Sequence, residues 1–191
     1  MRPTGSLAIL IAFVGVAVYG GSVLAAPAPA AHDHPAGSAG QAELAAVRRV
    51  TAQFHSVEAA VAAGYELGYV NGAGMRIITG CISNPTAGAM GYHYFNKALV
   101  DDMLVDPLEP EALVYARLPN GKLKLVAVEY VVPGPGSNPA GPSGTPPTVF
   151  GMEMHILVPP PGPGFYLHHA WIWRHNPAGM FADWNPEVTC P

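Results

Sequence analysis

The chain has 191 residues, of which 50% are hydrophobic and only 12% are charged, and its formal net charge is −4. Its basic residues form no patch, since the only adjacent pair is Arg48-Arg49, so the composition argues against nucleic acid as a partner. A chain of this length fits one domain with a core of ordinary size.

The first 25 residues have the three-part layout of a secretory signal peptide. Arg2 supplies a positive start, residues 7–18 form an apolar run, and Ala25 ends a small-residue cleavage pattern, with Ala30 as a second compatible position. The apolar run is too short for a committed membrane span. We therefore expect a secreted or periplasmic protein that keeps no stable membrane span after cleavage.

Residues 26–40 consist mainly of Ala, Pro, Gly and Ser, which predicts a disordered leader. Residues 41–191 are expected to form a single globular domain. This domain begins with a predicted helix over residues 41–63, in which apolar residues recur at steps of three and four. Gly64 supplies the stop of this helix.

After Gly64, short runs rich in Val, Ile, Tyr, Phe and Trp alternate with turn residues, which predicts strands. The expected strands are 65–70, 91–95, 112–117, 122–132, 148–158 and 165–174, with a short helix at 97–103. The proline-rich stretch 133–147 predicts a surface loop. We predict an α+β fold in which the N-terminal helix packs on a mostly antiparallel sheet of five or six strands. Such a sheet can also curl toward a barrel.

Cys81 and Cys190 are the two cysteines of the chain, and both lie in the part that is expected to be exported. In an oxidising compartment, two cysteines in one domain most often pair, so we predict a disulfide between them. In the chain-entropy model, a disulfide that closes a loop of this length stabilises the folded state by roughly 4–5 kcal/mol. The alternative is a pair of free thiols that act as metal ligands.

Glu129 is the single residue of the sequence that most strongly suggests a functional site. It lies in the expected strand 122–132, whose two faces are both apolar, so its carboxyl group projects into apolar surroundings. A carboxyl group there needs a partner, or it stays protonated with a raised pKa. The alternative is a structural role, in which Glu129 closes a hydrogen bond to a buried Tyr, Trp or backbone amide.

Histidines on the expected strands are the available partners of this carboxyl group. Imidazoles from adjacent antiparallel strands can converge on one metal ion, and a carboxylate completes a mixed site for Zn or Cu. The candidate metal ligands are His93, Glu129, His155 and His169, with His168 as the alternate to His169. The folded part has no His-x-His pair and no HExxH motif, so a purely structural role for these histidines is left open.

The stretch 171–186 gathers aromatic residues, two Asn-Pro turns and Asp183 in a short span. Aromatic side chains beside polar turns suit a ligand cleft, and they suit a well-packed chain end even better. No G-x-S-x-G motif and no phosphate-binding glycine loop occur, so the sequence identifies no catalytic residue.

Two motifs carry a resemblance to a known group of proteins. They are Gly-Ala-Met-Gly-x-His-Tyr at residues 88–94 and Trp-Arg-x-Asn-Pro-x-Gly-x-Phe-x-Asp-Trp-Asn-Pro at residues 173–186. Together with Cys81, the Val-Glu-Tyr strand at 128–130 and Cys190, they resemble a family of exported bacterial proteins that has no established activity. The resemblance implies a disulfide-bonded single domain and no reaction.

These observations predict an exported domain that binds a small molecule or a metal ion through its His and Glu residues. One alternative is a metal-dependent enzyme that uses the same residues. Another is an envelope protein whose polar core is purely structural. The sequence does not indicate an oligomeric state.

Overall fold

The computed structural model describes residues 38–137, 140–157 and 164–191, all of which belong to the unit Ala31–Pro191. The expected signal peptide and nearly all of the expected leader lie outside the described residues. The leader ends earlier than predicted, because helix α1 (Ser38–Thr51) already begins three residues before position 41.

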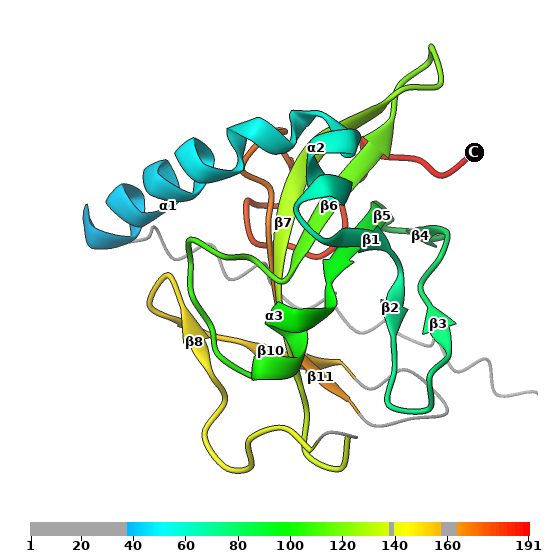
Figure 1. Cartoon of the computed structure of the whole chain (residues 1–191). Coiled ribbons are helices and arrows are strands. Elements are labelled where there is room, and N and C mark those ends of the chain that lie inside the picture. The colour runs from blue at the N-terminus through cyan, green and yellow to red at the C-terminus, as the bar shows by residue number, and fades with distance from the viewer. Residues whose placement is uncertain (1–37, 138–139, 158–163) are drawn as a thin grey trace, which may run out of the picture. The chain divides into compact units, whose positions relative to one another are not determined.

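The expected N-terminal helix consists of three pieces (Figure 1). Helix α1 continues into the 3-10 turn η1 (Ala52–His55), and α2 (Val57–Ala62) follows. The chain breaks at Ser56, whose extended backbone lets its hydroxyl accept the Ala59 N–H and cap α2. Gly64 ends the helical region at a φ of +92°, as predicted.

The main sheet has seven antiparallel strands in the order β1-β5-β6-β7-β11-β10, and β4 also pairs with β5. Their bounds are β1 Tyr65–Leu67, β4 Cys81–Asn84, β5 Gly88–Asn96, β6 Ala112–Arg117, β7 Leu123–Pro133, β10 His155–Leu157 and β11 Phe165–Ala170. The α+β prediction is confirmed, but the sheet is open and the suggested barrel is wrong. Both ends of the strand order, β1 and β10, are only three residues long and offer no ladder for closure.

Short elements complete the fold. Helix α3 (Lys97–Asp102) follows β5 directly. The strand expected at 65–70 is divided at Gly68, whose φ is +77°, and β2 (Tyr69–Val70) then pairs with β3 (Arg76–Ile77). The strand expected at 148–158 is also divided, because β8 (Thr148–Val149) turns back on β9 (Met152–Glu153) before β10 begins.

Each face of the sheet carries its own apolar core. On one face, side chains such as Leu113, Leu125 and Val128 form a core with Leu44 and Val47 of α1. On the opposite face, Val114 and Ala127 pack against Trp171 and Val188. The central strand β7 is therefore covered on both sides, as its sequence predicts.

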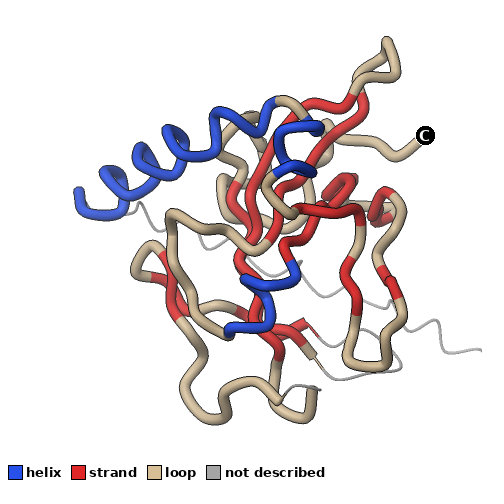
Figure 2. The backbone as a smooth tube through the Cα atoms, in the orientation of Figure 1, coloured by secondary structure: helices blue, strands red, loops and turns tan. Residues whose placement is uncertain are grey.

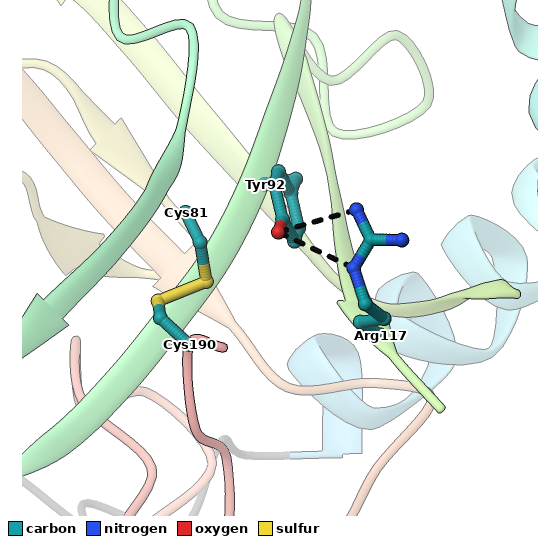
Figure 3. Close-up of a disulfide and its surroundings, with 4 residues drawn as sticks. All are labelled: Cys81, Tyr92, Arg117 and Cys190. Carbon is teal, nitrogen blue, oxygen red and sulfur yellow. Dashed lines mark hydrogen bonds between the residues drawn. A yellow bond between two sulfur atoms is a disulfide. The ribbon is translucent and has the colours of Figure 1, made fainter. Parts of the chain in front are cut away.

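Beyond β11 the chain runs to its C-terminal end in loops and turns (Figure 2). This C-terminal segment, residues 171–191, is held against the sheet by a backbone bridge between Ala89 and Asn185. The predicted disulfide between Cys81 of β4 and Cys190 holds its end (Figure 3). The segment is therefore attached to β4 and β5 at two neighbouring points.

Candidate functional site

Three of the predicted site residues come together on the sheet face that the C-terminal segment covers. Glu129 of β7 and His169 of β11 are direct register partners, so their side chains share this face. His93 lies two strands away on β5 and has Val114 as its partner. The residue opposite Glu129 on β6 is Ala112, whose small side chain leaves room for the carboxyl group and the imidazole to meet.

We call His93, Glu129 and His169 the His-Glu cluster. Their exposed fractions are 1%, 4% and 0%. The Nε2 atom of His93 lies 3.4 Å from Oε2 of Glu129, and the rings of His93 and His169 lie edge to face with centroids 6.2 Å apart. Apolar side chains surround the cluster, with Phe95 stacked on His93 and Trp171 packed against His169.

Burial sets the charge state of the cluster. It lowers the pKa of His93 to about 4 and that of His169 well below its ordinary value. It raises the pKa of Glu129 to about 8, and the nearby Asp183 carboxylate adds to this increase. All three groups are therefore uncharged at neutral pH, with a carboxylic acid beside two neutral imidazoles.

The imidazole nitrogens of the cluster lack well-formed hydrogen bonds within the part of the chain that the structure describes. Both ring nitrogens of His93 and both of His169 are buried without a hydrogen bond of ordinary geometry to any residue that the structure describes, and the Gly91 backbone has only a minor influence, which raises the pKa of His93 against the larger effect of burial. A neutral imidazole has one N–H donor and one lone-pair acceptor, so each ring keeps both functions available. Such a group can donate to a ligand, accept from one or coordinate a metal ion.

The other two predicted histidines lie outside the cluster. His155 of β10 shares the face but is half exposed, and its Nε2 contacts Oδ2 of Asp183 at 3.2 Å. The hydrogen bond to Asp183 raises the pKa of His155. His168 faces the opposite side, where it packs beside Phe150 and Phe181, and burial lowers its pKa to about 4.

A metal site with four ligands is not assembled. Within residues 38–137, 140–157 and 164–191, no group of three or more His, Cys, Asp or Glu side chains is arranged to hold a metal ion. Within the His-Glu cluster, Nε2 of His93 and Oε2 of Glu129 have the spacing of two ligands of one ion. Tetrahedral bonds of about 2.0–2.1 Å place neighbouring donors about 3.3–3.4 Å apart.

Glu111 is a buried carboxyl group that sequence reasoning missed. It is 1% exposed, burial raises its pKa to about 8, and its Oε2 accepts the backbone N–H of Val131. Its place just before β6, between a proline and an apolar run, gives no periodic signal of burial. Because the Glu111 carboxyl group is hydrogen-bonded to the backbone of β7, its role is structural.

The C-terminal segment also forms a pocket of about 380 Å³. The pocket is lined by Trp171, Arg174, His175, Asn176, Pro177, Gly179 and Met180. Trp171 connects the two regions, since it is one of the residues that line the pocket and its indole packs on His169 with ring centroids 4.7 Å apart. The aromatic and Asn-Pro residues of 171–186 thus form both a packed chain end and a hollow.

Comparison of the chain with family models, curated proteins and solved structures finds no match. In the described part of the chain, no helix is both long enough and apolar enough to cross a membrane. The functional argument therefore depends on the geometry of the His-Glu cluster and of the pocket.

Proposed function

We propose that this chain is an exported binding domain that takes a small ligand at the His-Glu cluster. The observation that carries the proposal is the set of buried, unpartnered ring nitrogens of His93 and His169 beside the carboxylic acid of Glu129. The layout of residues 1–25 and the Cys81–Cys190 disulfide support export.

The cost of burial separates a binding role from a structural one. A buried polar group without a hydrogen bond costs about 1–3 kcal/mol, so a core that serves stability alone satisfies its polar groups or replaces them by apolar ones. Two buried tyrosine hydroxyls of this domain are satisfied, since Tyr65 donates to Pro110 O and Tyr130 donates to Pro107 O, each at 2.8 Å. Four of the seven buried side-chain atoms without a partner in the described chain belong to His93 and His169.

The chemistry of the cluster narrows the class of ligand. A neutral carboxylic acid and two neutral imidazoles do not favour a highly charged ligand. They suit a small polar molecule that both donates and accepts hydrogen bonds. The 3.4 Å separation between His93 Nε2 and Glu129 Oε2 also suits Zn or Cu, for which a nitrogen of His169 would have to reach the same ion and Glu129 would have to lose its proton. Elemental analysis distinguishes the two ligands.

The test uses the protein purified from its exported location. Native mass spectrometry and elemental analysis should show a bound small molecule or metal ion in the wild type. The ligand should be reduced at least tenfold in His93→Leu and in His169→Leu, because each variant removes one pair of imidazole nitrogens. His55→Gln is the matched control, since His55 is an exposed imidazole that contacts Trp173.

One result would overturn the proposal. It is a wild-type protein that carries its unliganded mass alone and whose unfolding temperature does not change on addition of Zn(II) or Cu(II). Equal ligand content in the wild type and both cluster variants would also place the ligand elsewhere.

A further inference from the structure

We propose that the pocket in the C-terminal segment binds a small organic monocarboxylate, with Arg174 as the group that holds its carboxylate. This site is distinct from the His-Glu cluster. Among the lining residues, Trp171 is the one whose ring also packs on a residue of the cluster, His169. The inference therefore does not depend on the function proposed for the cluster.

The frame of the pocket is fixed by hydrogen bonds from asparagine side chains. The amide of Asn176 donates to Trp184 O and accepts the Ala178 N–H, each at 3.0 Å. The amide of Asn185 donates to His175 O at 3.0 Å. The floor is also fixed, because the backbone N–H of Trp171 donates to Met180 O. A frame with these internal bonds is organised before a ligand arrives, which reduces the entropy cost of binding.

Arg174 is anchored at one end of its guanidinium and is not fully paired within the described protein. Its Nη2 donates to Glu187 O at 2.8 Å and lies 4.0 Å from Glu187 Oε2, so this end of the guanidinium is anchored. Its Nε is buried and has no hydrogen-bond partner among the described residues. A guanidinium is always charged and prefers carboxylate or phosphate oxygens as acceptors. The Arg174 side chain as a whole is one-third exposed and lines the pocket, so its guanidinium supplies a permanent positive charge there and still has an N–H donor without an acceptor in the described protein.

The rest of the lining defines the remainder of the ligand. Arg174 is the only Lys or Arg among the lining residues, so one negative charge matches the site better than a phosphate dianion. Trp171, Pro177 and Met180 supply apolar surface. A volume of about 380 Å³ is in the range of sites for small molecules. A single ring or short chain that carries one carboxylate fits this combination of charge, surface and size.

The experiment titrates the full exported protein with benzoate, benzamide and inorganic phosphate by calorimetry. Benzoate should bind, and benzamide, which has the same ring without the charge, should bind at least tenfold more weakly. Arg174→Gln should weaken benzoate at least tenfold. Arg174→Lys keeps the charge but lacks the planar guanidinium that suits a carboxylate, so it should weaken benzoate binding by a smaller factor that still exceeds threefold. Arg117→Gln is the control, because Arg117 is an exposed guanidinium on β6 that bonds to Tyr92.

The proposal is overturned if benzoate does not bind. It is overturned equally if benzamide binds the wild type as tightly as benzoate does, or if Arg174→Gln binds benzoate as tightly as the wild type does. It is also overturned if phosphate binds more tightly than benzoate, since the apolar walls would then contribute nothing. The unfolding temperature of each variant is measured alongside, and His93→Leu should leave benzoate binding unchanged. Loss of binding at the cluster but not here, or the reverse, therefore tells the two proposals apart.

Discussion

Glu129 keeps its proton at neutral pH because apolar side chains surround its carboxyl group, which raises its pKa to about 8. In the unfolded chain the same group has its ordinary value of 4.5. The folded state therefore binds this proton more strongly, and its contribution to stability is complete below the ordinary pKa and is lost as pH rises through about 8. The buried histidines have the opposite effect on stability. Because burial lowers the pKa of His93 from 6.5 to about 4, its contribution to the free energy of unfolding is lost as pH falls through this range.

The substitution Glu129→Gln tests this charge state. Gln has nearly the same shape and does not titrate, so the variant should match the wild type near about pH 5 and exceed it in stability by about 2–4 kcal/mol near about pH 9. Urea unfolding measured across this range gives the difference at each pH. Glu111 titrates in the same direction and is present in both proteins, so its contribution cancels apart from the small effect of the Glu129 charge on the pKa of Glu111. A difference that is constant with pH would mean that Glu129 is ionised in the folded protein.

The substitution His93→Leu separates stability from binding. It replaces a ring whose two nitrogens have no protein partner by an apolar group of similar size, so the free energy of unfolding should stay unchanged or rise by about 1 kcal/mol. The same substitution should remove the ligand at the His-Glu cluster, which is a trade of function for stability. Denaturant unfolding of wild type and variant provides the measurement. A loss of more than about 2 kcal/mol would show that the ring nitrogens are satisfied in solution.

At the scale of elements, Gly91 of β5 lets two strands approach closely just before His93. Its φ is +122°, and a Cβ atom there would lie 2.5 Å from the carbonyl oxygen of Tyr115 on β6. Gly91→Ala should therefore open the β5–β6 pairing and lower the free energy of unfolding by about 2–4 kcal/mol. Gly121→Ala is the control, because Gly121 has a φ of +81° with open space around it and should cost only about 1–2 kcal/mol. Equal losses in the two variants would contradict the steric explanation.

Long strands are predicted well from the sequence and short ones are not. The pattern of 112–117 and 122–132 agrees with β6 and β7 to within one residue, because both strands are long enough for apolar runs to be seen. The strands β3 and β4 have no such run and were missed. Phe150 and Gly151 both have positive φ, which divides the strand expected at 148–158 and cannot be read from composition.

The candidate site was predictable in part for the same reason. The apolar setting of Glu129 follows from alternation along one strand, and the structure places His93 and His169 beside it. Their convergence depends on strand order and on the small side chain of Ala112, neither of which one sequence reveals. The place of His155 depends on the position of Asp183 in a segment without regular structure, so its separation from the cluster was not foreseeable.

At the scale of the whole molecule, the C-terminal segment covers the cluster and builds the pocket, yet it contains no helix or strand of its own within the described residues. Its attachment depends on Val188, which is buried against the sheet, on the bridge between Ala89 and Asn185, and on the disulfide. Both proposed sites therefore require this segment to stay in place.

The double substitution Cys81→Ser with Cys190→Ser tests that requirement. The disulfide joins residues 109 positions apart, so its loss should lower the free energy of unfolding by about 3–5 kcal/mol, mainly through the greater freedom of the unfolded chain. The segment after Asn185 should also fray, because the covalent attachment of its end to β4 is gone. Urea unfolding measures the first effect, and the rate of limited proteolysis near the C-terminal end measures the second. Wild-type protein treated with a reducing agent should behave as the variant does. Unchanged proteolysis in the variant would mean that Val188 and the Ala89–Asn185 bridge hold the segment without the covalent link.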